Sequence, residues 1–342
     1  MEENANSNDS LAPEPTGPHT SFPIISLIIS IVIVIIIVAI IIINLTRTST
    51  NTNQPTQENT TMPNPTTSNT TLAPTTKLNS GYEMPVLGLG TWTLDNETAE
   101  NSVYTAIKVG YRLIDTAQYY GNETGVGNAM KRAIDENLIT REDIFITTKV
   151  MSSNYSRAYA SIDESLSKLQ TNYIDLLFIH QPGTNDEATY KALEQGVKDG
   201  KIRSIGISNY YTPSELDEVL SFATITPALI QNENHIFYQN AELLNYAAKD
   251  NIKIESWYPF GGRGHTEESF TNETIVALAE KYHKTPAQII LRWQIQAGYI
   301  VIPGSSNSDH IAENFDIFNF ELTTTEMNDI AAINKNQRYE NW

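Results

Sequence analysis

The chain contains no cysteine among its 342 residues. Disulfide bonds, thiolate-bound zinc, iron–sulfur clusters and a cysteine nucleophile are therefore excluded. Basic residues are also scarce, because 22 Lys and Arg stand against 40 Asp and Glu. The resulting formal charge of −18 excludes a broad electrostatic surface for nucleic acid, and the acidic excess is typical of a solvated surface.

An apolar run occupies Ile24 to Ile43, where only Ser26 and Ser30 interrupt the aliphatic residues. A helix of that length would span about 30 Å, which is the thickness of the hydrocarbon layer of a bilayer. A cleaved signal peptide is the alternative, but it requires a basic region before the apolar run, and residues 1–21 contain no Lys or Arg. The sequence therefore predicts a disordered tail over 1–21 and a single transmembrane helix over 22–45.

Residues 46–78 consist largely of Thr, Ser, Asn, Gln and Pro. Such a segment buries too little apolar surface to offset the entropy of folding, which predicts a disordered linker. Arg47 is the basic residue nearest the apolar run and favours a cytoplasmic location for everything after it. Asn-x-Thr sequences such as Asn59 to Thr61 suit an outer surface equally well, so the membrane orientation stays open.

Residues 79–342 alternate between short β-branched runs and longer amphipathic segments. This pattern is typical of βαβ units, and eight such units in about 265 residues fit a (β/α)₈ barrel of the α/β class. A doubly wound sheet is the alternative, but its glycine fingerprint is incomplete because Thr93 stands where a third glycine would follow Gly88 and Gly90. The expected strands are Val86 to Trp92, Arg112 to Thr116, Ile144 to Val150, Ile174 to His180, Ile202 to Ser208, Ala228 to Gln231, Ile252 to Trp257 and Tyr299 to Pro303.

Polar residues follow several of these runs, at the ends that share one mouth in a barrel. Asp115, Lys149 and His180 mark the second, third and fourth runs. They offer neither paired histidines nor an acidic cluster suited to a metal ion. A lysine beside an aspartate stays charged and lowers the pKa of a neighbouring phenol, and Tyr120 follows Asp115 by five residues. The set suits reduction of a carbonyl, with Tyr120 as general acid, His180 as hydrogen-bond donor and a hydride donor on the other face.

The later runs end in residues that suit a nicotinamide. Ser208, Asn209 and Gln231 offer donors and acceptors for a carboxamide, and the indole of Trp257 could pack against the ring.

Ordered motifs run through the same segment. They are Gly88-Leu89-Gly90-Thr91-Trp92, Ile114-Asp115-Thr116-Ala117, Tyr119-Tyr120-Gly121-Asn122-Glu123, Thr148-Lys149-Val150, Leu177-Phe178-Ile179-His180, Ile205-Gly206-Ile207-Ser208-Asn209, Ser256-Trp257-Tyr258-Pro259-Phe260-Gly261, Ile302-Pro303-Gly304-Ser305-Ser306 and Ile311-Ala312-Glu313-Asn314. From about Gly81 to the C-terminus, this order resembles the aldo-keto reductase family, and in particular its bacterial-type diketogulonate reductases.

The resemblance implies roles for individual residues. Tyr120 would donate the proton, Lys149 paired with Asp115 would lower the pKa of that tyrosine, and His180 would orient the substrate carbonyl. The cofactor would be NADPH or NADH, bound without a Rossmann fold. The remaining implied contacts are Ser208, Asn209 and Gln231 with the carboxamide, Trp257 with the nicotinamide ring, Ser305 with the 2′-phosphate, Glu313 and Asn314 with the adenine, and Trp92 with the substrate.

The sequence departs from the family at the phosphate and substrate subsites. Gly304 and His310 stand where the family usually has Lys and Arg, so we expect a weakened preference for NADPH. Ser305 remains as a neutral donor, and Arg263 is an alternative cation. Gln181 replaces a Trp that often follows the histidine, which predicts a shallow pocket open to many small aldehydes and ketones.

Alternatives remain for single residues and for the function. Tyr119 is a second candidate acid, although its spacing from Asp115 is wrong by one residue. His235 is expected to satisfy hydrogen bonds in the core, and His265 and His283 to be exposed. A membrane-tethered module that binds cofactor with little turnover, or a surface adhesin, could reuse the fold. The expected partners are a small carbonyl compound and, through the apolar helix, a membrane; the barrel is expected to be monomeric.

Overall fold

Residues 72–340 are described by a computed structural model of the chain. The described residues belong to one compact unit, Ser68–Trp342. The predicted tail over 1–21, the predicted membrane helix over 22–45 and most of the predicted linker lie outside the described residues. Between residues 72 and 340, no helix is both long enough and apolar enough to cross a bilayer.

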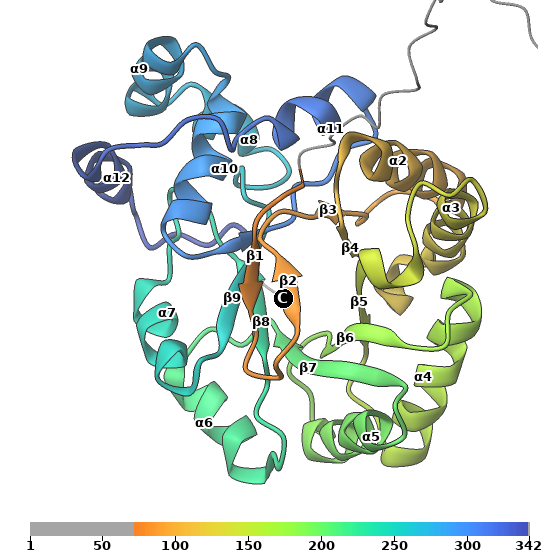
Figure 1. Cartoon of the computed structure of the whole chain (residues 1–342). Helices are drawn as coiled ribbons and strands as arrows, with labels where there is room; N and C mark the ends of the chain where they lie inside the picture. The colour runs from red at the N-terminus through yellow and green to blue at the C-terminus, as the bar shows by residue number, and fades with distance from the viewer. Residues whose placement is uncertain (1–71, 341–342) are drawn as a thin grey trace, which may run out of the picture. The chain divides into compact units, whose positions relative to one another are not determined.

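Eight parallel strands form the centre of the domain and follow one another in chain order (Figure 1). Isolated parallel bridges pair Leu87 with Val301 and Gly90 with Gly304, so the first strand meets the last and the sheet closes. The predicted α/β barrel is thereby confirmed. The strands are β3 (Leu89–Gly90), β4 (Leu113–Asp115), β5 (Phe145–Val150), β6 (Ile174–Ile179), β7 (Ile202–Ser208), β8 (Leu229–Glu233), β9 (Lys253–Trp257) and β10 (Ile300–Val301).

Helices surround this ring on its outside (Figure 1). Most of them lie where apolar residues recur at three and four positions in the sequence. The α-helices are α2 (Asn96–Val109), α3 (Glu123–Asp135), α4 (Tyr155–Leu169), α5 (Asp186–Lys198), α6 (Pro213–Phe222), α7 (Ala241–Ala247), α8 (Thr266–Phe270), α9 (Glu273–Tyr282), α10 (Pro286–Gln296), α11 (Ser308–Phe315) and α12 (Thr324–Ala331), and the 3₁₀ helices are η1 (Gln118–Tyr120), η2 (Arg141–Asp143) and η3 (Ala248–Asp250).

Local sequence sets where several helices begin. The hydroxyl of Thr212 accepts a hydrogen bond from the backbone of Glu215 at 3.2 Å, and the Glu215 carboxylate accepts one from the Thr212 backbone at 2.8 Å. Pro213 occupies the first turn of α6, where its missing N–H has no cost. Thr285 and Gln288 form the same reciprocal cap at the start of α10.

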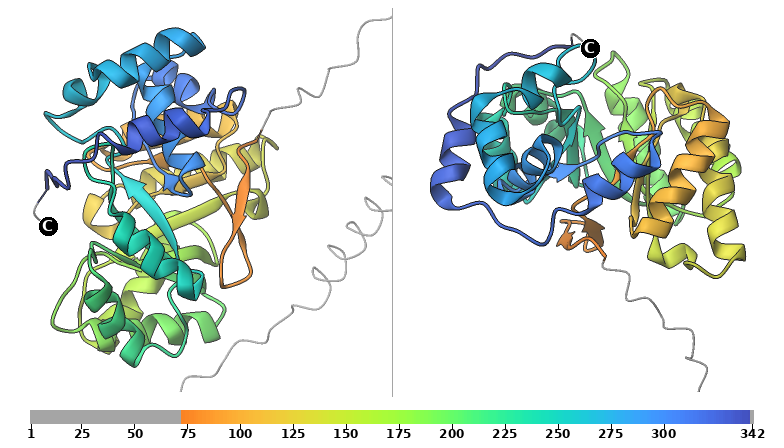
Figure 2. Two further views of the ribbon diagram at one scale, coloured as in Figure 1. Left: turned by 90° about the vertical axis from the view of Figure 1, so that its left-hand side faces the viewer. Right: turned by 90° about the horizontal axis from the view of Figure 1, so that it is seen from above.

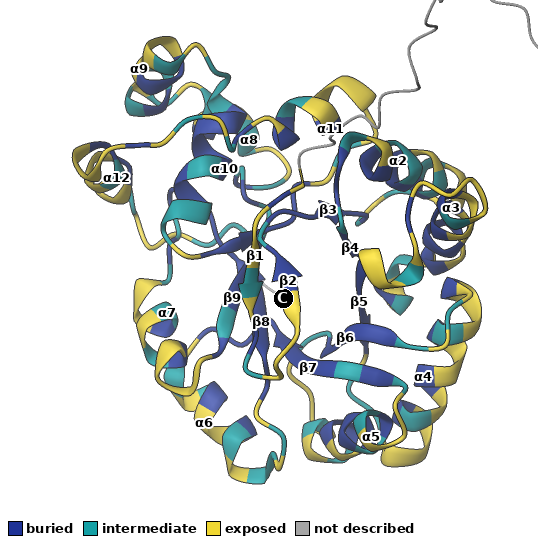
Figure 3. Ribbon diagram, viewed as in Figure 1, coloured by how far each residue is buried: buried dark blue, intermediate teal, exposed yellow. Residues whose placement is uncertain are grey.

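Two apolar layers hold the barrel together, and most residues of the strands between them are buried (Figure 3). One fills the interior of the ring and includes Leu113, Phe145 and Leu229. The other lies between the strands and the surrounding helices and includes Val103 and Ile162. The interior layer occupies one end of the ring, which leaves the other end for polar groups.

A two-stranded hairpin covers the apolar end of the barrel (Figures 1 and 2). It pairs β1 (Thr75–Lys77) with β2 (Glu83–Pro85), and it buries Leu78 and Met84 against the interior layer. The linker predicted for 46–78 overlaps this hairpin at residues 75–78 and must be corrected there. Pairing with β2 and burial of Leu78 outweigh the polar composition of the segment.

Candidate active site

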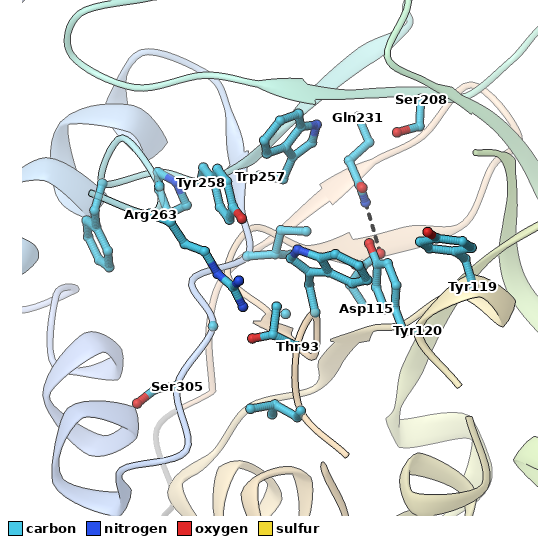
Figure 4. Close-up of a pocket in the computed structure, with 18 of the residues that line it drawn as sticks. Thr93, Asp115, Tyr119, Tyr120, Ser208, Gln231, Trp257, Tyr258, Arg263 and Ser305 are labelled. Carbon is cyan, nitrogen blue, oxygen red and sulfur yellow. Dashed lines mark hydrogen bonds between the residues drawn. The ribbon is translucent and has the colours of Figure 1, made fainter. Parts of the chain in front are cut away.

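A cavity of about 780 Å³ opens at the carboxyl ends of the strands (Figure 4). Lys149 is not among the residues that line it. Glu313 and Asn314, the implied adenine contacts, also lie outside its lining. The predicted residues that do line the cavity are Trp92, Asp115, Tyr120, His180, Ser208, Asn209, Gln231, Trp257, Ser305, Gly304, His310, Gln181 and Arg263.

A fully buried ion pair forms the floor of the site. The Lys149 ammonium donates to both carboxylate oxygens of Asp115, at 2.6 and 2.8 Å, and to the Thr116 carbonyl at 3.0 Å. The side chains of Lys149 and Asp115 are 1% and 3% exposed, so water does not screen them. Burial acts to lower the pKa of Lys149, but Asp115 and Tyr120 raise it above its ordinary value. The lysine therefore keeps its positive charge.

Tyr120 is held directly above this pair. It ends the turn η1, where Gly121 adopts a left-handed conformation with φ of 70°. The Asn122 side chain fixes the turn by donating to the Thr91 carbonyl at 2.8 Å. The Lys149 Nζ atom lies 4.8 Å from the centre of the Tyr120 ring.

The net pKa shift of Tyr120 differs from the one that the resemblance implies. Burial raises the pKa of Tyr120 to about 12, and the nearby Lys149 ammonium only partly opposes this effect. The lowering expected from Lys149 is therefore present, but desolvation outweighs it and the net pKa is raised. A phenol with this pKa keeps its proton at neutral pH, which is the form that a general acid requires.

His180 follows β6 and presents its ring edge to Tyr120, with 5.6 Å between the ring centres. Burial and the Lys149 charge lower the pKa of His180 to about 3. The imidazole is therefore neutral near pH 7. Its buried Nδ1 atom has no hydrogen-bond partner within residues 72–340, while the residue itself lines the cavity.

The amide side chains at the mouth are already oriented by the protein. The Gln231 Nε2 atom donates to Asp115 Oδ2 at 2.9 Å (Figure 4). The same atom donates to Glu255 Oε2 at 2.6 Å. Asn209, with φ of 68°, donates to the His180 carbonyl at 2.9 Å and accepts from the Tyr211 hydroxyl at 3.0 Å. Both amide hydrogens of Gln231 are engaged, so its carbonyl oxygen is what it can offer to a carboxamide. This polar set, beside the indole of Trp257, fits a nicotinamide.

The part of the cavity where a 2′-phosphate is expected has little positive charge. Arg263 is the lone Lys or Arg among the described residues of its lining, and its guanidinium extends into the cavity in Figure 4. His310 is exposed at the start of α11, and Ser305 accepts a hydrogen bond from the Asn307 backbone at 3.1 Å. Glu313 instead accepts from a threonine hydroxyl outside the cavity, so its implied adenine contact stays a prediction.

The C-terminal segment fastens the loop that carries Arg263. The ring of Tyr339 stacks on His265, with 3.6 Å between ring centres. The buried Glu233 carboxylate accepts the backbone N–H of Tyr339 at 2.6 Å and that of Glu340 at 3.1 Å. His265 is thus half-buried rather than exposed as expected, because the sequence gives no sign of this stacking partner.

The core position expected for His235 and the exposure expected for His283 are confirmed. His235 is buried and shares a 3.0 Å hydrogen bond with Glu233, and His283 is exposed. Tyr119 is 65% exposed and lacks the close approach to Lys149 that Tyr120 has.

One buried acidic residue near the site was not predicted, because only the residues that end the apolar runs were considered. Glu255 lies in the middle of β9 and ends no apolar run. Residues two apart in a strand face the same side, so the spacing of Glu255 from Trp257 could have predicted that it faces the site. The lining residues that sequence reasoning did not assign include Thr93, Leu94, Met151, Phe260, Thr266, Ser306 and Asn307.

Comparison with known proteins supports one family. The aldo/keto reductase family profile matches residues 86–335. The NAD(P)H-dependent D-xylose reductase I,II of Candida tropicalis is 38% identical over 305 residues, which covers 78% of this chain and 94% of the relative. Glyoxal reductase of Bacillus subtilis is 42% identical over 271 residues, covering 78% and 95%. Methylglyoxal reductase DkgA of Escherichia coli K12 is 39% identical over 267 residues, covering 77% and 94%.

Solved structures agree with this result. The aldo-keto reductase of Bombyx mori in complex with NADP superposes with a TM-score of 0.75 at 33% identity, covering 79% of this chain and 96% of that one. An aldo-keto reductase from a deep-sea metagenome library gives 0.74 at 36% identity, covering 78% and 97%. The chain therefore belongs to the aldo/keto reductase family, as an NAD(P)H-dependent oxidoreductase that reduces aldehydes and ketones.

Proposed function

We propose that this enzyme reduces short 2-oxoaldehydes and similar small aldehydes, with Tyr120 as the proton donor. The observation that carries the proposal is the protonated phenol of Tyr120 held between the Lys149 ammonium and the neutral ring of His180. A carbonyl oxygen placed between the phenol and the imidazole would accept hydrogen bonds from both.

The residues divide the reaction between them. The nicotinamide, when bound, supplies a hydride to the carbonyl carbon. His180 orients the carbonyl, and the Tyr120 hydroxyl gives its proton to the oxygen as negative charge develops there. The Lys149 ammonium, fixed by Asp115, stabilises the phenolate that remains.

The wall of the cavity supports a small and weakly polar substrate. Trp92 packs against the Tyr120 ring at 4.7 Å between centres, and Met151 and Phe260 add apolar surface. Gln181 stands where an aromatic wall would otherwise narrow the entrance. A polyol would need several fixed hydrogen-bond partners on this wall, whereas a two- or three-carbon dicarbonyl needs few.

The names of two relatives, glyoxal reductase and methylglyoxal reductase, point to the same substrate class. The test is kcat/KM of the full chain with methylglyoxal, glyoxal and D-xylose at a fixed NADPH concentration. We expect both dicarbonyls to exceed D-xylose by about 100-fold, as a pocket without polyol contacts requires. Equal or better use of D-xylose would reject the substrate class without rejecting carbonyl reduction.

We further propose that NADPH and NADH are used with similar efficiency. Gly304 and His310 supply no permanent positive charge for a 2′-phosphate, and Arg263 alone offers one from the opposite loop. The ratio of kcat/KM for the two cofactors tests this, and a preference above about a thousandfold for NADPH would require phosphate contacts worth about 4 kcal/mol.

We also propose that residues 22–45 anchor the enzyme in a membrane with residues 79–342 in the cytoplasm. The apolar run Ile24 to Ile43, which contains no charged residue, and the nearby Arg47 support this proposal. Membrane fractionation followed by protease treatment of intact cells tests it. Recovery of the full chain in the soluble fraction would reject the anchor, and digestion of the barrel from outside would reject the orientation. A tethered module with little turnover would instead be retained in the membrane, bind NADPH and reduce none of the three substrates.

A further inference from the structure

The barrel interior contains a second buried carboxyl group that the proposed reaction does not use. Glu255 on β9 is fully buried, and its neighbours by strand register are Gln231 on β8 and Ile300 on β10. Its Oε2 atom accepts from Gln231 Nε2 at 2.6 Å. Its Oε1 atom is buried without a hydrogen-bond partner in the described part of the chain.

The charges around Glu255 do not balance. Asp115 and Glu255 are bridged by the single amide nitrogen of Gln231, and Lys149 donates only to Asp115 within this group. The cluster thus holds two acids and one base, whose side chains are at most 3% exposed. Two carboxyl groups in such a position cannot both ionise readily, so one retains its proton near neutral pH. Asp115 has the ammonium, which leaves the proton on Glu255.

The other titratable groups around the cluster leave this assignment unchanged. Burial and Asp115 raise the pKa of Glu255 to about 8, while Gln231 and Lys149 act to lower it. Tyr120 and His180 have pKa values of about 12 and about 3, so neither changes its protonation state near the pKa of Glu255. Further along β8, the carboxylate of Glu233 is held by a buried histidine and by backbone N–H groups of the C-terminal segment. The neighbouring strand β10 contributes Ile300 and Val301, which do not titrate.

We infer that Glu255 is a proton-binding positioning residue, which fixes the Gln231 amide and whose ionisation favours the oxidised over the reduced nicotinamide. The inference rests on the proposed place of the nicotinamide beside Gln231 and Trp257. While protonated, Glu255 adds no charge beneath the ring. Once ionised, it adds a negative charge that attracts the positive ring of NAD⁺ and has little effect on the neutral ring of NADH. Its proton therefore couples the redox state of the bound cofactor to pH.

The test is the ratio of the dissociation constants of NAD⁺ and NADH for the full chain, measured by quenching of tryptophan fluorescence from pH 6.5 to 9.5. The ratio cancels contributions common to both cofactors, such as those of the phosphates and of Arg263. In the unmodified protein we expect the ratio to fall by about tenfold as pH rises through this range, which corresponds to one pKa unit of coupling. Glu255→Gln keeps an oxygen that can accept from Gln231 but cannot ionise, so its ratio should not change with pH.

Glu194→Gln provides the matched control. Glu194 is also a buried glutamate, but it lies on α5 and accepts the backbone N–H groups of Thr224 and Ile225. We expect this variant to keep the pH dependence of the unmodified protein. A Glu255→Gln protein that keeps the same dependence would overturn the inference, as would a Glu194→Gln protein that loses it.

A second measurement uses only the unmodified protein and therefore does not depend on folding of the variant. Calorimetric titration in buffers of different ionisation enthalpy counts the protons released on binding. At pH 8 we expect NAD⁺ binding to release a fraction of a proton and NADH binding to release none. Equal release with both cofactors would overturn the inference. Failure of either cofactor to bind would instead reject the proposed cofactor site, so the two failures can be distinguished.

Discussion

The buried ion pair between Lys149 and Asp115 should contribute to stability and catalysis in separable ways. In Asp115→Asn, the Lys149 ammonium loses its charged partner while it stays 1% exposed. In Lys149→Met, the Asp115 carboxylate remains beside Glu255 without a cation. Removing one partner of a buried pair typically costs about 3–5 kcal/mol of unfolding free energy. Coulomb's law with an effective dielectric constant of about 20 gives a similar value, about 5 kcal/mol, for charges about 3 Å apart.

The double variant Asp115→Asn/Lys149→Met removes both charges together. We expect the double variant to lose less unfolding free energy than the two single variants lose together. The difference should be about 3–5 kcal/mol, because neither charge is left unpaired. Catalysis should not recover, since the double variant lacks the ammonium beside Tyr120. Urea unfolding followed by tryptophan fluorescence, together with kcat for methylglyoxal, measures the two effects on the same proteins.

A second buried carboxylate, which binds two arginines, serves as the control. Asp175 binds Arg141 at 2.7 Å and Arg203 at 2.9 Å, and it lies near the start of β6, away from the cavity. Asp175→Asn should lower stability and leave kcat within about twofold of its original value. The reasoning fails if the Asp115 and Lys149 losses are additive within about 0.5 kcal/mol, or if the double variant regains activity.

Three further outcomes are expected. Tyr120→Phe should lower kcat by about 10² to 10⁴ while the dissociation constant of NADPH changes by no more than about twofold, and Tyr119→Phe should stay active; the reverse pattern would assign the acid to Tyr119. His310→Arg should raise kcat/KM for NADPH over NADH by about tenfold, with an unchanged ratio as the contrary result. This exposed position is a cleaner test than Gly304→Lys, because a Cβ atom at 304 would lie 3.2 Å from the Gly90 carbonyl oxygen. Because folding lowers the pKa of His180 from 6.5 to about 3, the unfolded chain binds the proton first, and stability is lost as pH falls through this range. In urea titrations, His180→Gln should therefore lose less unfolding free energy between pH 7 and pH 5 than the unmodified protein loses. An equal loss in the two proteins would count against a neutral His180 in the folded state.

The barrel and its catalytic floor could be predicted because they depend on local pattern and on strand order. β-branched runs mark each strand, and parallel strands bring their carboxyl ends to one mouth. Asp115 and Lys149 therefore had to meet once β4 and β5 were neighbours. The hairpin β1–β2 could not be predicted in the same way, because its first strand has the composition of a linker and is stabilised by distant contacts of Leu78.

The electrostatics of the site also needed three-dimensional information. The pKa of Tyr120 is a balance between burial and the Lys149 charge, and a sequence shows the charge but not the burial. Glu255 was missed because it interrupts an apolar strand without ending it. The stacking of Tyr339 on His265 joins residues far apart in the chain, and no local periodicity announces such a contact.

The attachment of Tyr339 to the Arg263 loop also sets an order of events during protein synthesis. Ribosomes add about 5–20 residues per second, so residues 335–340 emerge after every strand of the barrel. The ring can therefore close around Lys149 and Asp115 before Tyr339 reaches His265 and the Glu233 carboxylate. The catalytic floor matures first on the nascent chain, and the loop facing the cofactor phosphates acquires its final support last.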